Sequence, residues 1–321
     1  MPPKRFVLIG NGYAGSFNKK AIDYVGGELV ACCDILPERA SAYPGAKPYT
    51  DWRKAIREEA DLYVICTPSG LHYEMTVELL KRNKNVIVEK PVIMTLQEMD
   101  ILEVAKKSSG KCFPILQNRY NPYIKYIKEQ VLPLLGEVFQ LHFAGYWRRD
   151  DAYFTGWHAE ERMAGSILHQ QFLHHLDLIC YLFGEVDSTH TLSATRRRRV
   201  SFADSIVATF TIGKTFGTIN CSVLPTINEE TSLTILAERG FIEIGGKTLD
   251  VIRQWDAPLP APDPKIRPDI NRYPGYTGSL ALHPNIYENI LGVLEGKAPP
   301  FIPLESALSS MKFVFKLLGI E

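Results

Sequence analysis

A glycine-rich turn near the start of the chain, "GNGYAG" over residues 10–15, constrains the fold more than any other feature. It follows the apolar run "RFVLIG" and precedes a helix-compatible segment. Gly10, Gly12 and Gly15 have G-x-G-x-x-G spacing, which permits a tight strand-to-helix turn and the approach of a pyrophosphate to backbone N–H groups. The turn therefore predicts the first unit of a dinucleotide-binding sheet. The cofactor contacts expected here also include Asn11, Tyr13 and Ala14.

Asp34 ends the next apolar run, "LVACC", about 20 residues beyond the turn. A carboxylate at this place can accept hydrogen bonds from both ribose hydroxyls and would repel a 2′-phosphate. Asp34 therefore favours NAD over NADP. Arg39 is close enough in sequence to leave some tolerance for NADP open, and the alternative for the whole motif is a plain glycine turn with a surface aspartate.

Strand and helix patterns alternate through the first third of the chain. Apolar runs over 62–66 and 86–88 separate helical patterns over 52–59, 72–82 and 95–107. Thr95 and Glu98 have the spacing of a capping box at the start of the last helix. This alternation predicts a doubly wound parallel sheet, an α/β domain of the Rossmann type that extends to about residue 121.

The pattern of expected helices and strands changes beyond Pro122. A helix over 123–135 and an apolar helix over 167–184 accompany strand-like runs over 138–147, 205–212, 216–224, 232–237 and 240–246. These features predict an α+β domain, an open antiparallel sheet with helices on one side. Because 321 residues exceed one ordinary core, we expect an NAD-binding domain over 1–121 and a substrate-binding and oligomerisation domain over 122–321. Six prolines between residues 256 and 276 predict a surface loop or arm.

The charge balance indicates a small-molecule partner. Lys and Arg together number 36, as do Asp and Glu, so no overall field attracts nucleic acid or an anionic membrane. "RRRR" over 196–199 is accordingly interpreted as a solvated turn. The start lacks signal-peptide features, and no apolar run is long enough to span a bilayer. The six cysteines form no C-x-x-C pair, which favours reduced core residues in a cytoplasmic protein without a metal site.

Polar residues follow two strands at the edge of the expected parallel sheet. Thr67, Pro68, Ser69 and His72 lie in "CTPSGLHYE", where a cofactor contact and a simple helix cap are both open for His72.

The second strand ends in Glu89-Lys90-Pro91, and Lys90 should point into the crevice beside the nicotinamide. There it could hydrogen-bond a substrate hydroxyl and exchange a proton. The alternative is a lysine that reaches back to water.

The apolar helix over 167–184 carries one polar stripe. Gln170, His174 and Asp177 fall at i, i+4 and i+7, and such a stripe in a core helix needs partners or a cavity. The alternatives are a histidine satisfied within the core and, less favoured, a metal site that would also use His169 and His175. Upstream, Trp147 and Trp157 suit a sugar ring or a base, while Arg148 and Arg149 suit phosphate or carboxylate; a plain surface loop is the alternative.

These motifs together resemble the glucose-fructose oxidoreductase and inositol dehydrogenase (Gfo/Idh/MocA) family over nearly the whole chain. The matching segments are "GNGYAG", "TPSGLH", "EKP", "QNRYNP" and "AGSILHQQFLHHLDLICYLFG". The resemblance implies an NAD-binding Rossmann domain, a catalytic pair of Lys90 and His174, and a homodimer or homotetramer formed through the second sheet. Gln170 and Phe172 depart from the family pattern, which has Asp or Asn and Gly there.

One branch of this family, the UDP-N-acetyl-2-amino-2-deoxyglucuronate 3-dehydrogenases, is resembled by three segments. They are the aromatic segment "GYWRRDDAYFTGWHAEER" over residues 145–162, "QNRYNP", and "HPNIYENI" with His283 and Tyr287. The implied cofactor contacts add Glu89, Lys90 and Gln117. The implied substrate contacts are Lys90, Arg119, Tyr120, Trp147, Arg148, Trp157, Gln170, His174 and Asp177.

The expected function is hydride transfer between a ring carbon of a sugar or nucleotide-sugar and nicotinamide. The most specific version of this prediction is 3-dehydrogenation of a UDP-N-acetyl-hexuronate. His174 would remove the hydroxyl proton and Lys90 would orient and polarise the oxygen, or the two roles could be exchanged. Two alternatives stay open, a dehydrogenase or ketoreductase of inositol or a free sugar, and a non-catalytic regulator that senses dinucleotide and sugar.

Overall fold

The computed structural model describes residues 2–197, 200–226, 230–263 and 278–320, which form two compact units. The first unit contains residues 1–116 and 280–308, and the second contains residues 117–279 and 309–321. The structure thus adds a late segment, 280–308, to the unit that begins the chain. The proposed division at residue 121 did not anticipate this return.

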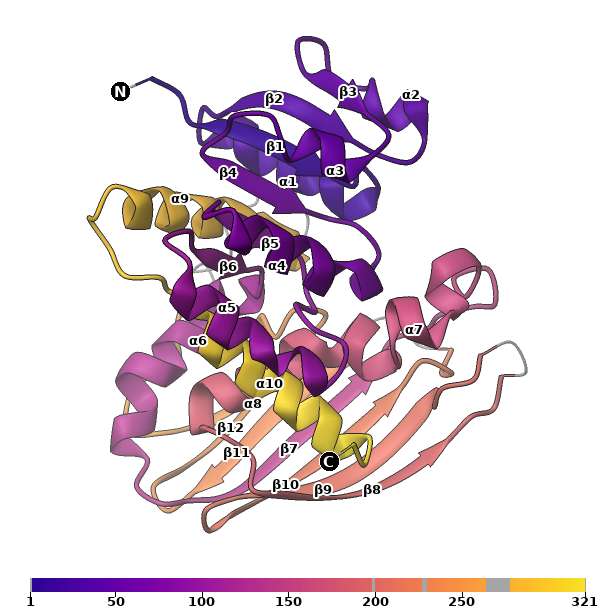
Figure 1. The fold of residues 1–321 in the computed structure, drawn as a ribbon. Helices are drawn as coiled ribbons and strands as arrows, with labels where there is room; N and C mark the ends of the chain where they lie inside the picture. The colour runs from indigo at the N-terminus through magenta and orange to yellow at the C-terminus, as the bar shows by residue number, and fades with distance from the viewer. Residues whose placement is uncertain (1, 198–199, 227–229, 264–277, 321) are drawn as a thin grey trace. The chain divides into compact units, whose positions relative to one another are not determined.

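A six-stranded parallel sheet forms the centre of the first unit (Figure 1). Its order is β3-β2-β1-β4-β5-β6, and every pairing is parallel. The strands are β1 (Arg5–Ile9), β2 (Glu28–Cys33), β3 (Lys47–Tyr49), β4 (Leu62–Ile65), β5 (Val86–Val88) and β6 (Cys112–Pro114). This is the doubly wound order of dinucleotide-binding domains, so the predicted α/β fold is confirmed.

The helices of this unit follow the strands in alternation. They are α1 (Tyr13–Tyr24), α2 (Pro37–Ala40), α3 (Trp52–Ala55), η1 (Ser69–Leu71), α4 (His72–Lys81), η2 (Gln97–Asp100), α5 (Ile101–Lys107), η8 (Gly278–Leu282) and α9 (His283–Leu294). Helix α10 (Leu304–Leu317) begins in this unit and continues into the second. Of the expected capping box, one half forms, because the Glu98 carboxylate accepts from the backbone N–H of Thr95 at 3.3 Å.

The geometry of the turn between β1 and α1 explains why two of its positions need glycine. Gly10 has a φ of +90° and lies against the Cys66 carbonyl, so a Cβ at this position would be strained and crowded. A Cβ on Gly15 would overlap the carbonyl oxygen of Gly10. On Gly12, by contrast, it would meet no atom nearer than 3.9 Å, which leaves open space in front of α1.

A seven-stranded sheet forms the centre of the second unit, in the order β13-β12-β11-β7-β10-β9-β8. All pairs are antiparallel except β7 with β10, which run parallel, so the predicted antiparallel sheet is in fact mixed. The strands are β7 (Val138–Tyr146), β8 (Ser188–Ala194), β9 (Ser205–Ile212), β10 (Thr215–Ser222), β11 (Glu230–Ala237), β12 (Gly240–Gly246) and β13 (Val251–Asp256).

One face of this sheet is covered by helices, and alternation along β7 and β9–β12 buries side chains beneath them. Phe143 of β7 stacks on His175 of α8 (Leu173–Phe183) with ring centroids 5.2 Å apart. Phe210 of β9 meets Phe313 of α10 edge-on at 5.2 Å. The first contact fixes α8, which carries the proposed catalytic histidine, to the sheet, and the second fixes α10.

Two helices expected from the sequence are interrupted by wider π turns. The helix expected over 123–135 is α6 (Pro122–Tyr126), a π segment η4 (Ile127–Val131) and the 3₁₀ turn η5 (Leu132–Leu134). The helix expected over 167–184 begins as a π segment, η7 (Leu168–Phe172), before α8. The remaining short helices are η3 (Gln117–Tyr120), η6 (Gly156–Ala159) and α7 (Glu161–Ala164). Gln170 and His174 therefore do not share one regular α-helix, and the uniform i, i+4 stripe is wrong at its first step.

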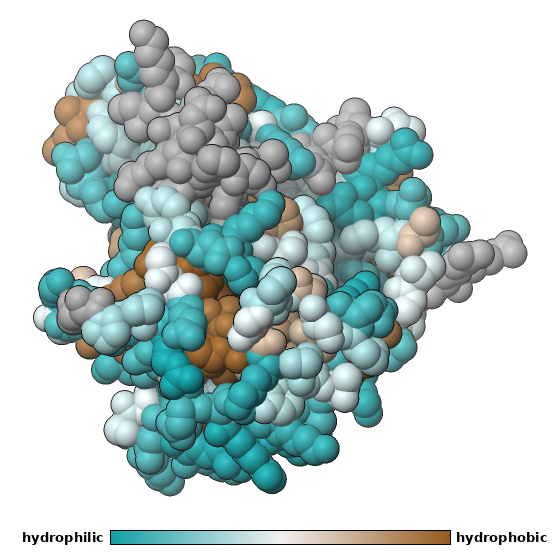
Figure 2. Space-filling model, turned by 90° about the horizontal axis from the view of Figure 1, so that it is seen from above, coloured by the Kyte–Doolittle hydropathy of each residue, from teal (hydrophilic) through white to brown (hydrophobic). Residues whose placement is uncertain are grey.

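The surface shown in Figure 2 is mostly hydrophilic, with one patch of hydrophobic residues. Within the described residues, no helix has the length and apolar character needed to cross a membrane. Much of the proline-rich stretch over 256–276, and the last two arginines of 196–199, lie outside the described residues.

Candidate active site

The carboxylate of Asp34 stands beside the glycine turn, as the sequence predicts. One oxygen accepts from the backbone N–H of Asn11 at 2.8 Å, and the other accepts from that of Leu36 at 3.0 Å. Each oxygen keeps a further acceptor site, since an ionised carboxylate can accept about four hydrogen bonds. Arg39 contributes its carbonyl to the Asn11 amide at 2.8 Å, and its guanidinium is the group nearest the open space at Gly12.

The residues of the glycine turn fit a dinucleotide. No side chain caps α1, whose first turn holds no acidic residue, so its N-terminal N–H groups are available to a pyrophosphate. The open space at Gly12 lies at the same helix end. Gly12 and α1 would hold the pyrophosphate, and Asp34 would accept from the ribose hydroxyls.

His72 is buried, and both of its ring nitrogens face backbone carbonyls. Nδ1 lies 2.7 Å from the oxygen of Pro91, and Nε2 lies 2.8 Å from the oxygen of Thr67. Burial lowers the pKa of His72, although the two carbonyls act in the opposite direction. Because its two ring nitrogens contact the carbonyls of Pro91 and Thr67, His72 connects the segment after β4 to the segment after β5. The ring does not cap α4, and a contact of His72 with the cofactor stays a prediction.

Lys90 follows β5 and is partly exposed, next to the largely buried Glu89. The backbone N–H of Glu89 donates to Ile65 of β4 at 3.0 Å, so Lys90 begins where the sheet ends. Burial acts to raise the pKa of Glu89, but contacts with His283 and Asn18 outweigh it and lower that pKa below its ordinary value. Glu89 is therefore an ionised group beside the lysine.

Arg119 and Asp177, both expected as substrate contacts, pair with each other inside the second unit. Arg119 Nε and Nη2 donate to the two carboxylate oxygens at 2.8 and 2.6 Å, and the side chains are 1% and 0% exposed. Ser310 of α10 donates its hydroxyl to the same carboxylate at 2.5 Å. Burial alone would lower the pKa of Arg119, but Asp177 raises it. This arrangement joins η3, α8 and α10.

His174 is the second residue of α8. It is partly exposed, whereas the neighbouring His175 is buried. Gln170 holds a different segment, because its amide donates to the carbonyls of Gly165 at 3.2 Å and His158 at 3.3 Å. Among the residues expected along the polar stripe, His174 carries an imidazole and is partly exposed.

Phe172, the second departure from the family pattern, is fully buried against the sheet. Its ring lies edge-on to Phe143 and Trp147, at 6.4 and 6.0 Å. A Cβ on Gly145 would meet this ring at 2.5 Å, so the missing side chain at 145 makes the room that Phe172 fills. The extra bulk is thus accommodated in the core.

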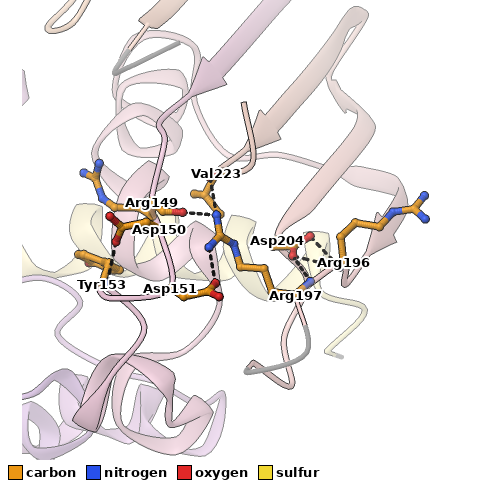
Figure 3. A network of polar contacts seen from close by, with 8 residues as sticks. All are labelled: Arg149, Asp150, Asp151, Tyr153, Arg196, Arg197, Asp204 and Val223. Atoms are coloured by element: carbon orange, nitrogen blue, oxygen red, sulfur yellow. Dashed lines mark hydrogen bonds and ion pairs between the residues drawn. The ribbon is translucent and has the colours of Figure 1, made fainter. Parts of the chain in front are cut away.

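The aromatic segment is organised around its arginines (Figure 3). Arg149 lies over the rings of Trp147 and Tyr153, at 5.4 and 5.2 Å, and donates to the carbonyl of Arg148 at 2.8 Å. Arg148 is exposed, and Trp157 stacks on His158 with centroids 3.8 Å apart. Cation–π contacts of this kind hold a guanidinium without consuming all of its donors.

Arg197 fastens this segment to the sheet (Figure 3). Its guanidinium pairs with Asp151 at 2.8 Å and donates to the carbonyl of Arg149. Asp204, fully buried, accepts from the backbone N–H groups of Arg196 and Arg197 at 2.8–3.1 Å. The interpretation of "RRRR" as a solvated turn is therefore wrong for Arg197, whose side chain is 15% exposed, while Arg196 is exposed as expected.

Two family models match the chain. One, described as an oxidoreductase family with an NAD-binding Rossmann fold, covers residues 4–115, and the other, the GFO/IDH/MocA C-terminal domain, covers 134–243. The chain belongs to the GFO/IDH/MocA oxidoreductase family. Its first unit is an NAD-binding Rossmann domain, as the glycine turn and Asp34 indicated.

Relatives of this family differ in their substrates. The chain is 27% identical to a putative UDP-kanosamine synthase oxidoreductase subunit of Amycolatopsis mediterranei, over 60% of this chain and 55% of that protein. It is 26% identical to the scyllo-inositol 2-dehydrogenase (NADP(+)) IolW of Bacillus subtilis, over 64% and 59%. The matches thus span somewhat more than half of these relatives.

A solved structure matches over a longer range. The WlbA dehydrogenase of Bordetella pertussis, crystallised in complex with NADH and UDP-GlcNAcA, has a TM-score of 0.90 with this chain at 26% identity. The match covers 99% of this chain and 95% of that one.

The predicted site residues fall into two groups. The first unit brings together the ends of β1, β2, β4 and β5, which carry Gly10, Asn11, Gly12, Tyr13, Ala14, Gly15, Asp34, Thr67, Pro68, Ser69, His72, Glu89 and Lys90. The second unit holds Gln117, Arg119, Tyr120, Trp147, Arg148, Trp157, Gln170, His174 and Asp177. Sequence reasoning missed the organising contacts of Arg197, Asp204 and Ser310, for which spacing along the chain gave no signal.

Loss of the Asp177 carboxylate should destabilise the second unit strongly. Asp177→Ala leaves the Arg119 guanidinium buried without its counter-charge, which typically costs about 3–5 kcal/mol in the free energy of unfolding. Urea denaturation followed by circular dichroism measures this loss. The control is Glu185→Gln, which removes an exposed carboxylate beside Lys312 and should cost about 1 kcal/mol or less. Equal effects of the two variants would contradict a structural role for the buried pair.

Proposed function

We propose that this protein is an NAD-dependent dehydrogenase that oxidises a secondary hydroxyl on the ring of a nucleotide-linked sugar, in its sharpest form C3 of a UDP-N-acetyl-hexuronate. The observation that carries the proposal is the likeness, over 99% of the chain, to a dehydrogenase crystallised with NADH and UDP-GlcNAcA. A lysine at the end of β5 and a partly exposed histidine on α8 supply the acid–base groups that such a reaction needs.

The chemistry assigned to the chain is positioning and proton transfer. NAD, when bound, accepts the hydride from the ring carbon. Lys90 donates a hydrogen bond to the reacting oxygen and polarises it, while His174 removes the hydroxyl proton. Lys90 belongs to the first unit and His174 to the second, so their joint action on one oxygen is a proposal. In the reverse direction the same groups return the proton to a ketone, by microscopic reversibility.

The nucleotide is assigned to the aromatic segment. Arg148 is exposed, and Arg149 is held between two rings with its neighbour's carbonyl fixing one N–H. Guanidinium groups match the paired oxygens of a diphosphate, and the rings of Trp147 and Trp157 suit a base or sugar. Inositol and free sugars lack the diphosphate, and the relation to an inositol dehydrogenase makes them the competing substrates.

Self-association through the second sheet is part of the proposal. The uncovered face carries short polar and β-branched side chains, with Phe216, Val207 and Leu192 exposed among them. Such a flat face can pair with a second copy of itself in a homodimer or homotetramer. A monomer in light scattering at micromolar concentration would overturn this part. The cytoplasmic location also stays a prediction, supported by the six free cysteines.

Removal of either proposed acid–base group should abolish most turnover while NAD still binds. We expect Lys90→Ala and His174→Ala to lower kcat by about a hundredfold to ten-thousandfold. Reduced cofactor is followed at 340 nm with a panel of UDP-hexuronates, free aldoses and inositols, and NAD affinity is measured by calorimetry. Lys90→Arg is the sharper control, because it keeps the charge but does not readily release a proton, so it should be nearly as impaired.

Retention of most activity in Lys90→Arg would remove the lysine from the chemistry. Tight NAD binding without turnover on any compound of the panel would instead favour the non-catalytic sensor.

The nucleotide should be recognised by Arg148. Arg148→Gln removes charge-assisted hydrogen bonds of about 1.5–3 kcal/mol each, and so should raise KM for a UDP-sugar by about 10–100-fold. Steady-state kinetics would show little change in KM for a free sugar. The control, Arg196→Gln, removes another exposed arginine near the same segment and should leave both KM values unchanged. Equal effects of Arg148→Gln on both substrates would assign the arginine to solubility or folding.

A further inference from the structure

Helix α9 returns to the first unit from far along the chain and packs beside α1 (Figure 1). Its first turns are buried, with His283 2% exposed and Tyr287 fully enclosed. The Tyr287 ring lies 6.1 Å from that of Phe6 in β1. Apolar packing therefore accounts for the ring of Tyr287 but not for its hydroxyl, nor for a buried histidine.

The polar atoms of these two residues lead to Glu89. The Tyr287 hydroxyl donates to the Asn18 side-chain oxygen at 2.7 Å, and the Asn18 amide donates to Glu89 Oε1 at 2.9 Å and to the carbonyl of Ala14 at 3.0 Å. Because the hydroxyl occupies the oxygen of Asn18, the NH₂ group is the end that faces the carboxylate. Tyr287 thus fixes which way Asn18 points.

His283 approaches the same carboxylate oxygen from the other side. Its Nε2 lies 3.6 Å from Glu89 Oε1, and its Nδ1 lies 3.1 Å from the carbonyl of Leu280. Both ring nitrogens therefore face oxygen acceptors, and the ring is held with Nε2 toward Glu89. These contacts, together with Asn18, lower the pKa of Glu89 against the effect of burial.

The two oxygens of Glu89 face different groups. Oε1 faces Asn18 and His283, while Oε2 accepts from the backbone N–H of Lys90 at 3.3 Å. A carboxylate is rigid and planar, so groups that fix one oxygen also set the direction of the other. The position of the Lys90 backbone is thereby connected to a helix that begins almost 200 residues later, at His283.

We propose that His283 and Tyr287 are positioning residues: through Asn18 and Glu89 they hold Lys90 in the geometry needed for hydride transfer. This inference rests on the proposed function, because it assigns their effect to the chemistry of Lys90. Catalytic groups misplaced by about 1 Å can cost about a hundredfold in rate, so the loss of one hydroxyl in such a relay is measurable.

Tyr287→Phe is the decisive variant, because it keeps the ring against Phe6 and removes only the hydroxyl. We expect kcat to fall by about tenfold, with KM and the NAD dissociation constant within about twofold of wild type. The matched control is Tyr24→Phe. That hydroxyl also joins α1 to α9, by donating to Glu288 at 3.1 Å, but it lies on the exposed side and away from Glu89. Its removal should leave kcat unchanged.

Two further variants separate positioning from packing. His283→Gln keeps a donor that can reach Glu89 and should retain more activity than His283→Leu, which keeps only bulk. Without cofactor or substrate, the amide resonance of Lys90 in ¹⁵N-lysine-labelled protein should shift in Tyr287→Phe and stay in place in Tyr24→Phe. The double variant Tyr287→Phe/Lys90→Ala should lose no more activity than Lys90→Ala alone, because groups that act as a unit are non-additive.

The two proposals fail in different ways. Full activity of Lys90→Ala would overturn the proposed function, whatever the α9 variants do. If Lys90→Ala is inactive while Tyr287→Phe and His283→Leu keep wild-type kcat and the Lys90 amide does not shift, the positioning role is overturned alone. A fall in kcat matched by equal losses of NAD affinity and thermal stability would also overturn it, since that pattern belongs to packing.

Discussion

A carboxylate withdrawn from water must be surrounded by N–H groups or a counter-charge, and four such carboxylates organise this protein. Asp34 gathers backbone N–H groups beside the glycine turn, and Asp204 does the same where the sheet of the second unit meets the aromatic segment. Asp177 takes a guanidinium and a hydroxyl, and Glu89 takes an amide, an imidazole and a backbone N–H. Each acid holds in place a segment that also carries a proposed functional residue.

This constraint explains why two residues chosen as ligands turned out to face inward. Asp177 is a polar residue within an apolar helix, and such a residue in a sequence suggests a cavity with a substrate in it, while Arg119 was expected as a substrate contact from the family resemblance. The structure satisfies the same requirement by pairing them with each other, at 2.6 and 2.8 Å. The pattern along α8 indicates that Asp177 needs a polar partner, but it does not indicate which residue supplies one. That partner, Arg119, lies 58 residues earlier in the chain.

The sequence was sufficient for the first sheet because its signals are local. The Gly10-to-Gly15 turn, Asp34 and the strand-end motifs lie within short stretches, and parallel strands bring their carboxyl ends to one edge without further information. The predicted α/β domain followed from these residues. The π segment over Leu168–Phe172 could not be predicted in this way. Phe172, its last residue, packs into the space above Gly145 of β7, a contact that no local stretch of sequence contains.

The return of α9 to the first unit was likewise not predictable from periodicity. "HPNIYENI" has the pattern of an amphipathic helix and would pack on any apolar surface. Its choice of surface depends on Tyr287 meeting Phe6 and Asn18, which no local window contains. The "EKP" motif predicted that Lys90 ends a strand. It gave no indication that His283 of α9 contacts the carboxylate of the neighbouring Glu89.

That return also sets the order in which the protein can be assembled on the ribosome. The hydrogen bond between Asn18 and Tyr287 spans 269 residues of sequence, so the nucleotide-binding unit emerges early yet stays incomplete through most of translation. Until α9 appears, Asn18 and Glu89 are polar groups at a surface that is built to be covered. The first unit therefore stays incomplete until residues 280–308 have been synthesised, and the apolar and acidic surface that α9 covers is exposed in the meantime.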